Sequence, residues 1–390
     1  MPTFRENLRL LPRPVWILFG GTFINRFGSF VMPFLVLFMT GKGYTPAQAG
    51  LAVSAYGIGH LVASMTGGHL ADRIGRRHTI VISMFGSAMA MMALSQARGY
   101  VMLLVMTFFA GALAELYRPA ALALISDLVA PEQRVTAFGV YRWAVNLGFA
   151  AGPATAGFVA VHSYLYLFVG DALTSLIYGI VALTALPHGL HGQTKDERAT
   201  EGFRVALRDS VYLRFLLATL CISWIEFQAH STLPLYVTGS GYTARDYGLL
   251  MSINGTMIVI FELGITAWTQ RLPQQPVIAI GYALSGIGFA LTGLAHGMPA
   301  FAMTVVVWTL AEMTWAPVAG AFISGLAPER YRGRYMGLWS MSLSIGMVIG
   351  PILGTYIYQR QPTVLWIACG VMGCVGAGLT MSKVRGFHAQ

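Results

Sequence analysis

Residues 43–50 read Gly-Tyr-Thr-Pro-Ala-Gln-Ala-Gly, and residues 241–248 read Gly-Tyr-Thr-Ala-Arg-Asp-Tyr-Gly. The shared Gly, Tyr, Thr and Gly positions lie 198 residues apart, which is the difference between 241 and 43. Residues 148–153 and 346–351 both carry Gly-x-x-x-Gly-Pro at the same offset. An offset that holds at both ends of a half-length segment indicates that the two halves of the chain share one plan.

The composition excludes an ordinary soluble fold. Of the 390 residues, 56% are hydrophobic and only 10% are charged, whereas soluble domains carry about 25% charged residues. Many apolar runs are about 20 residues long, enough to cross a bilayer as helices, and the sequence does not show the short alternating segments of membrane β-strands. In so apolar a chain, a direct repeat of half its length predicts a transporter built from two similar helical bundles.

The hydrophobic pattern predicts an all-α membrane protein with twelve transmembrane helices in two pseudo-symmetric six-helix bundles. The bundles are expected at residues 1–187 and 212–390, joined by a polar cytoplasmic connector at residues 188–211. The expected spans are approximately 14–39, 47–70, 78–97, 100–127, 135–160, 163–186, 214–238, 244–268, 276–295, 299–324, 334–358 and 362–382.

Basic residues predict the orientation in the membrane, because cytoplasmic loops are enriched in Lys and Arg. With the N-terminus inside, only Lys42, Arg98, Arg245 and Arg360 of the 25 basic residues fall in outside loops. Both termini are therefore expected in the cytoplasm of a multi-pass protein of the plasma (inner) membrane. The net charge of +10 follows from these inner loops, so it does not indicate nucleic-acid binding.

The loop between the second and third spans, residues 68–77, reads Gly-His-Leu-Ala-Asp-Arg-Ile-Gly-Arg-Arg. With the twelve spans and the repeat, it resembles the signature loop of the major facilitator superfamily, G-x-L-a-D-R-x-G-R-R. The resemblance implies a latch on the cytoplasmic side, in which Arg76 can pair with Asp127 and Asp72 can accept hydrogen bonds at a helix N-terminus. Alternatively, these charges only fix the topology and solvate a loop. The expected latch residues are Gly68, Asp72, Arg73, Gly75, Arg76, Arg77, Asp127 and Arg134.

Span five carries Gly148, Gly152, Pro153 and Gly157, a pattern that resembles the antiporter motif of the family's bacterial twelve-span drug/proton antiporters. Small residues at this spacing allow close helix packing, and Pro153 kinks the helix. The resemblance favours efflux over uptake. Span eleven has a similar pattern, so simple helix packing is the alternative explanation.

Ionisable side chains at membrane depth are costly unless paired or hydrated, so each one marks a candidate functional position. Arg26, Glu115, Glu226 and Glu312 lie near the middle of spans one, four, seven and ten, which occupy equivalent places in the repeat. In the family these four helices line the central cavity, and the pattern therefore predicts a polar site at the bilayer midplane. The expected cavity residues are Asn25, Arg26, Arg118, Tyr141, Arg142, Trp224 and Trp315.

Two of the acidic side chains have helical neighbours with which they can interact. Glu115 shares a helix face with Arg118 and pairs either with it, with Arg26, or with substrate. Glu226 shares a face with His230, and because burial disfavours the charged form of both, either is able to exchange a proton near neutral pH. The expected proton-coupling residues are Glu226 first and Glu312 second, with Glu115 and His230 as further candidates.

Three other polar residues receive structural explanations. Asp171 and Glu262 lie nearer the ends of their spans, where snorkelling or local pairing explains them. His60 in span two is expected to be a helix-packing residue rather than a ligand.

The sequence contains no nucleotide-binding loop, nucleophile constellation or metal-ligand spacing among its three cysteines. No cofactor is expected, and the energy for transport is expected from an ion gradient. The leading hypothesis is a secondary active transporter, not an enzyme, that exports a small amphipathic solute by alternating access in exchange for protons. Its partners would be that solute, protons and the lipid bilayer, and the chain is expected to be a monomer that binds no nucleic acid.

Two alternative functions remain open. The Asn25-Arg26-Phe27 stretch, with acids in spans seven and ten, faintly resembles the peptide-symporter branch of the family, which predicts proton-coupled uptake of a solute or peptide. A membrane-embedded enzyme or a receptor is the third hypothesis, but neither of these needs the repeat or the inner latch.

Overall fold

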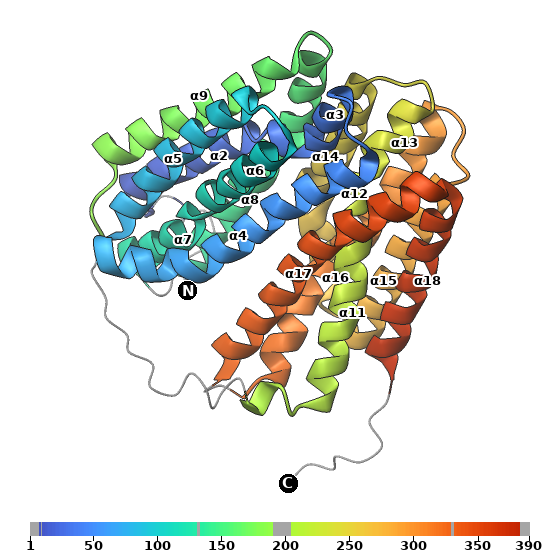
Figure 1. The fold of residues 1–390 in the computed structure, drawn as a ribbon. Helices are drawn as coiled ribbons and strands as arrows, with labels where there is room; N and C mark the ends of the chain where they lie inside the picture. Colours follow the sequence, from blue (N-terminus) through green and yellow to red (C-terminus); the bar gives the residue numbers. More distant parts are fainter. Residues whose placement is uncertain (1–7, 9, 131–132, 190–203, 329–330, 383–390) are drawn as a thin grey trace. The chain divides into compact units, whose positions relative to one another are not determined.

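The computed structural model describes residues 8, 10–130, 133–189, 204–328 and 331–382, and every regular element in these ranges is a helix (Figure 1). The two termini and residues 190–203 of the expected connector lie outside the described residues. The helices are α2 (Arg13–Phe27), α3 (Val31–Gly41), α4 (Pro46–Ile74), α5 (Arg76–Gln96), α6 (Tyr100–Glu115), α7 (Tyr117–Leu128), α8 (Arg134–Ala160), α9 (Tyr164–Ala185), α11 (Ser210–Glu226), α12 (Gln228–Ser231), α13 (Leu233–Gly239), α14 (Ala244–Thr269), α15 (Gln274–Thr292), α16 (Met298–Leu326), α17 (Arg332–Arg360) and α18 (Pro362–Met381).

The described part of the chain is an all-helical multi-pass membrane protein. Eleven of its helical stretches are long and apolar enough to cross a membrane. The 27-residue α8 is also long enough, but it is more polar because it carries Arg134, Arg142 and Asn146. The helices correspond to the twelve expected spans with one difference: spans one, four and seven are each broken into shorter helices.

By its internal contacts the chain divides into two compact units, residues 1–194 with 237–259 and residues 195–236 with 260–390. In the first unit, α2 packs against α8 and α9, and α5 packs against α6, α7 and α9. In the second unit, α11 packs against α17 and α18, and α15 packs against α16 and α18. These helices occupy matching places in the two halves of the sequence, as a direct repeat predicts. The expected ends of the two six-helix bundles, residues 187 and 212, stay a prediction from the sequence.

The repeat is also visible in the backbone where helices begin. Gly43 and Gly241 have φ angles of +88° and +90°, a conformation that glycine adopts readily because it has no Cβ. A threonine, Thr45 or Thr243, lies two positions after each glycine. Its backbone N–H donates to the side chain of the residue three positions later, and its hydroxyl oxygen accepts from the backbone N–H of that residue. This reciprocal arrangement is a capping box. The repeated stretch therefore starts the long helices α4 and α14.

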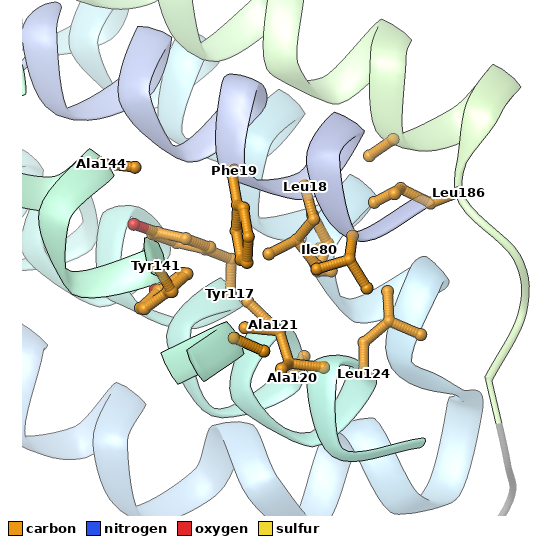
Figure 2. Close-up of a cluster of buried hydrophobic side chains, with 14 of the residues drawn as sticks. Leu18, Phe19, Ile80, Tyr117, Ala120, Ala121, Leu124, Tyr141, Ala144 and Leu186 are labelled. Carbon is orange, nitrogen blue, oxygen red and sulfur yellow. The ribbon is translucent and has the colours of Figure 1, made fainter. Parts of the chain in front are cut away.

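The apolar core of the first unit lies where α2, α5, α7 and α8 meet (Figure 2). Leu18 and Phe19 from α2, Ile80 from α5 and Leu124 from α7 are buried there. Tyr141 of α8 packs in the same layer, with its ring centroid 6.5 Å from that of Phe19. Because this layer removes a large apolar area from water and lipid, it fixes α2 and α7, the helices that carry the basic residues of the candidate site.

Candidate functional site

The charged residues in the middle of three spans lie at helix breaks. Arg26 is in the last turn of α2, before a break at residues 28–30. Glu115 and Glu226 are the last residues of α6 and α11. A break inside a membrane frees backbone N–H and C=O groups that lipid cannot satisfy, so protein groups must bond them.

A proline follows each broken stretch. Pro33, Pro119 and Pro234 lie in the first turns of α3, α7 and α13. A proline has no N–H and clashes with the carbonyl four residues earlier, so a helix does not run undisturbed through it. The first turn of a new helix accepts proline because the N–H has no helical partner there. The expected spans are continuous, and these prolines are the feature of the sequence that accompanies their breaks. A proline does not always break a span, because α16 contains Pro317 and is continuous.

The break in span four is closed by Ser83, a fully buried residue of the neighbouring helix α5. Its hydroxyl donates to the Leu113 carbonyl at 2.5 Å and accepts from the Tyr117 backbone N–H at 3.0 Å. One side chain therefore satisfies a backbone group on each side of the break, and it holds the end of α6 that carries Glu115.

The break in span one is closed by Asp171 of α9. The residue is only 5% exposed, and its Oδ2 accepts from the Val31 backbone N–H, at 3.4 Å, at the start of α3. Of the two explanations expected for Asp171, snorkelling does not apply and pairing does, because the buried carboxylate caps a helix N-terminus inside the unit. Close packing shapes the same break: a Cβ on Gly28 would lie 1.8 Å from Thr174 Oγ1.

In the second unit, Gln228 closes the break in span seven. Its buried side-chain amide donates to the carbonyls of Trp224 and Gly350 at 2.8 and 3.2 Å. Its Oε1 accepts from the hydroxyl of Thr232 at 3.0 Å. Neither Ser83 nor Gln228 stands out in the sequence, because an uncharged polar residue inside a span is not distinctive until its partners are known.

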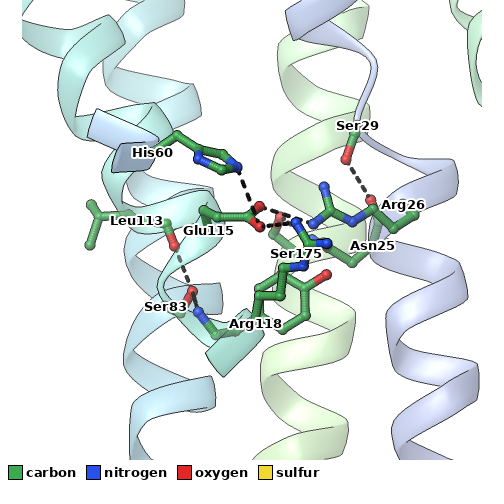
Figure 3. Close-up of polar contacts among 10 residues, drawn as sticks. Asn25, Arg26, Ser29, His60, Ser83, Leu113, Glu115, Arg118 and Ser175 are labelled. Carbon is green, nitrogen blue, oxygen red and sulfur yellow. Dashed lines mark hydrogen bonds and ion pairs between the residues drawn. The ribbon is translucent and has the colours of Figure 1, made fainter. Parts of the chain in front are cut away.

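A polar cluster of the first unit gathers around Glu115 (Figure 3). Its Oε2 lies 3.0 Å from Arg26 Nη2, and its Oε1 lies 3.0 Å from Arg118 Nη1. Both pairings considered from the sequence are therefore present together. His60 Nε2 lies 3.4 Å from Glu115 Oε1, so His60 belongs to this cluster rather than serving only in helix packing. Asn25 adjoins the cluster and donates to Ser175 Oγ at 3.2 Å.

Aromatic residues adjoin the two arginines. The Arg26 guanidinium lies 5.6 Å from the centre of the Tyr117 ring, within the range of a cation–π contact. Tyr141 lies near enough to Arg26 and Arg118 to interact with both. Arg142 is exposed on α8. The unit thus combines buried charge with apolar ring surface, a mixture typical of small-molecule sites.

The second unit holds an acidic pair. Glu226 Oε1 accepts from the Ser285 hydroxyl at 3.0 Å, and the charge of Glu312 on α16 acts on Glu226. Trp315 is buried one turn beyond Glu312, and its ring centroid lies 5.3 Å from that of Tyr282. Trp224 is buried in the last turn of α11. His230 lies in α12, and since the break at Phe227 separates it from Glu226, the two do not share one regular helix face.

The signature loop forms its ion pairs around Arg76. Arg76 Nη1 lies 2.6 Å from Asp72 Oδ1, and Arg76 Nε lies 3.3 Å from Asp127 Oδ2. The expected Arg76–Asp127 pair is thus present, while Asp72 is bonded by Arg76. Gly75 has a φ of +94° that separates α4 from α5. The other expected latch residues are not part of these ion pairs. Arg77 donates to the Leu186 carbonyl and Arg134 donates to the Ser126 carbonyl. Arg73 is exposed, and a Cβ on Gly68 would meet no atom of another described helix within 4 Å.

The glycines of α8 allow close helix packing within the first unit. A Cβ on Gly148 would lie 2.8 Å from Arg26 Cβ, and one on Gly152 would lie 2.7 Å from the Phe27 carbonyl oxygen. A Cβ on Gly157 would lie 3.0 Å from the Ala244 carbonyl oxygen of α14. Pro153 sits inside the helix between these contacts. The motif therefore positions the end of α2 that carries Arg26, whatever its bearing on transport direction.

The described residues contain no cluster of His, Cys, Asp and Glu suited to a metal ion.

The sequence profile of the Major Facilitator Superfamily matches residues 18–272 and 232–385. The chain is 26% identical over 384 residues to "Multidrug resistance protein 1" of Bacillus subtilis (strain 168), covering 96% of this chain and 97% of that protein. It is also 26% identical over 373 residues to a "Na(+), Li(+), K(+)/H(+) antiporter" of Planococcus maritimus, covering 86% and 87%.

A solved structure with a similar fold is that of a POT family transporter in complex with 5-aminolevulinic acid. The TM-score is 0.81 and the sequence identity 18%, with 94% of this chain and 95% of that chain covered. At this identity the likeness concerns the fold alone. The family match spans nearly the whole chain and agrees with the signature loop and the helical repeat. The chain therefore belongs to the Major Facilitator Superfamily and is a membrane transporter rather than an enzyme.

Proposed function

We propose that the protein is a secondary active transporter of the plasma membrane that exports a small amphipathic solute in exchange for protons. It works by alternating access, as a monomer with both termini in the cytoplasm. The two sequence halves, 1–187 and 212–390, act as its two bundles. Arg76 with its partners Asp72 and Asp127 serves as the cytoplasmic latch, and the solute contacts residues of the Arg26–Glu115–Arg118 cluster in the first unit.

The observation that carries this proposal is the Glu226–Glu312 interaction inside the second unit. Two neighbouring carboxyl groups in a low-dielectric span repel each other when both are ionised, so the pair holds a proton that it releases when water or substrate reaches it. The Ser285 hydroxyl, 3.0 Å from Glu226, stabilises the ionised form after release. A pair of this kind is able to couple proton movement to a change of conformation.

Export rather than uptake is favoured by the α8 motif and by the names of the sequence relatives. One relative is named as a multidrug resistance protein and another as a cation/proton antiporter. The aromatic side chains beside Arg26 supply the apolar surface that an amphipathic solute needs.

The test is transport in proteoliposomes with a fluorescent amphipathic dye. Exchange of dye without an imposed gradient is expected for a carrier, and a proton gradient is expected to drive dye and protons in opposite directions. Glu226→Gln and Glu312→Gln should abolish gradient-driven accumulation while exchange persists. Glu262→Gln, which removes a carboxyl group from α14, is the matched control and should retain both activities.

Unchanged proton-driven accumulation in both Glu226→Gln and Glu312→Gln would remove the acidic pair from the coupling role. Movement of dye in the same direction as protons would instead support the uptake alternative. If the wild-type protein does not exchange the dye although circular dichroism shows that it is folded, the proposal of a carrier for this class of solute is wrong.

A further inference from the structure

In the polar cluster of the first unit, several basic side chains share one carboxylate. Glu115 faces two guanidinium groups, those of Arg26 and Arg118, each at 3.0 Å. His60 adds a third contact to the same carboxylate. Asp171 is a second carboxyl group that acts on Arg26, and its Oδ2 also accepts from the amide at the start of α3. Arginine keeps its proton in proteins, so two charged guanidinium groups share the single carboxylate of Glu115.

The cluster also holds more hydrogen-bond donors than acceptors. Arg26 Nε is buried and bonds no acceptor among the described residues. The hydroxyls of Tyr117 and Tyr141, in residues only 0% and 5% exposed, likewise have no partner in the described part of the chain. Buried donors without acceptors are costly, and Glu115 is already shared by three groups. The missing component is therefore a hydrogen-bond acceptor, and among acceptors an oxyanion forms the strongest hydrogen bonds with guanidinium groups.

Arg118 shows where such a group can enter. Its side chain is 53% exposed, while Glu115 beside it is only 5% exposed. A guanidinium near the middle of a span does not face lipid, because exposing that charge to hydrocarbon is strongly unfavourable. Its planar fork presents paired N–H groups that match two oxygens of a carboxylate or sulfonate.

We infer that Arg118 and Arg26, with the hydroxyls of Tyr117 and Tyr141, form a subsite for an oxyanion group on the transported solute. The solute is then an amphipathic organic acid, whose carboxylate or sulfonate binds this cluster while its apolar body contacts the aromatic rings. This inference rests on the proposed carrier function, because it assigns the substrate class of that carrier.

Equilibrium binding to the purified full-length protein in detergent tests the subsite without any gradient. The probes are 1-naphthaleneacetate and its neutral amide, which have nearly the same shape and differ in charge. Calorimetry is expected to show the acid binding at least about tenfold more tightly than the amide, as for one charge-assisted hydrogen-bonding pair. Inorganic sulfate at millimolar concentration should compete with the acid and not with the amide.

Arg118→Gln is expected to remove the preference for the acid over the amide, and an unchanged helix content by circular dichroism shows that the variant is folded. Arg118→Lys keeps the charge but loses the fork, so an intermediate preference is expected. Arg360→Gln, which removes a positive charge that lies over the Tyr356 ring instead, is the control and should keep the full preference.

The inference is overturned if the wild-type protein binds acid and amide equally, if neither probe binds, or if Arg118→Gln keeps the preference. Counterflow with the same probes separates this outcome from failure of the carrier proposal. Selective binding of the acid without exchange would leave the subsite and remove the carrier function. Exchange of the amide as efficient as that of the acid would leave the carrier and remove the subsite.

Discussion

Replacement of Ser83 by alanine should destabilise the protein far more than the loss of one hydroxyl suggests. The Ser83 hydroxyl bonds the Leu113 carbonyl at 2.5 Å and the Tyr117 N–H at 3.0 Å, and the residue is fully buried. Ser83→Ala leaves both backbone groups without a partner inside the membrane. Since each unsatisfied buried group costs about 1–3 kcal/mol, the expected loss is about 2–6 kcal/mol in the free energy of unfolding.

The same helix offers a matched control. Ser87 lies one turn beyond Ser83 and is 1% exposed, but its hydroxyl has no hydrogen-bond partner among the described residues. Ser87→Ala removes the same atom without orphaning a backbone group, so stability should stay equal or rise slightly. Both substitutions remove one hydroxyl from a buried residue of the same helix. They differ only because the Ser83 hydroxyl bonds the backbone at the break in span four and the Ser87 hydroxyl does not.

The assay is reversible unfolding in mixed micelles, in which added sodium dodecyl sulfate unfolds the protein and far-ultraviolet circular dichroism follows helix content. Ser83→Ala should unfold at a clearly lower fraction of dodecyl sulfate than the wild type, with Ser87→Ala close to the wild type. Equal stability of Ser83→Ala and the wild type, or equal losses in the two variants, would refute the account of the break in span four.

Two further predictions concern the other break and the latch. Gly28→Ala places a Cβ 1.8 Å from Thr174 Oγ1, so a loss of about 1–3 kcal/mol in the free energy of unfolding is expected. In the same assay, the double variant Gly28→Ala with Thr174→Gly should lose less stability than the sum of the two single variants. Strictly additive losses would contradict the close contact. Arg76→Gln removes the ion pairs with Asp72 and Asp127. In a cysteine-free protein that carries Ser126→Cys, the new cysteine should therefore react faster with a maleimide when Arg76→Gln is present than when the control substitution Arg98→Gln is present. Equal reaction rates would argue against a latch.

Much of the fold could be predicted from local sequence features. Hydrophobic runs define the spans, because each helix must cover its own length of bilayer. The offset between Gly43 and Gly241 places two equivalent loops, and both adopt the same positive-φ turn and capping box. The signature loop correctly predicts the Arg76–Asp127 pair. Pro33, Pro119 and Pro234 mark the broken spans, but proline alone does not predict a break, because α8, α16 and α17 run through Pro153, Pro317 and Pro351.

The candidate site depends more on tertiary packing. Asp171 and His60 look peripheral in the sequence, yet one caps α3 and the other contacts Glu115. Whether Glu115 pairs with Arg26 or with Arg118 was open from the sequence, and the structure contains both pairs.

The sequence by itself determined that this chain is a helical membrane protein of repeated design, with ionisable residues in the middle of four equivalent spans. Those properties are local, because they follow from composition, periodicity and short motifs. Only the tertiary structure decided which charges meet, since Arg26 and Glu115 are 89 residues apart and their contact depends on how two broken helices are rotated and packed. Ser83, Gln228 and the glycines of α8 set that packing by satisfying freed backbone groups and allowing close approach, and their partners are specified only in three dimensions.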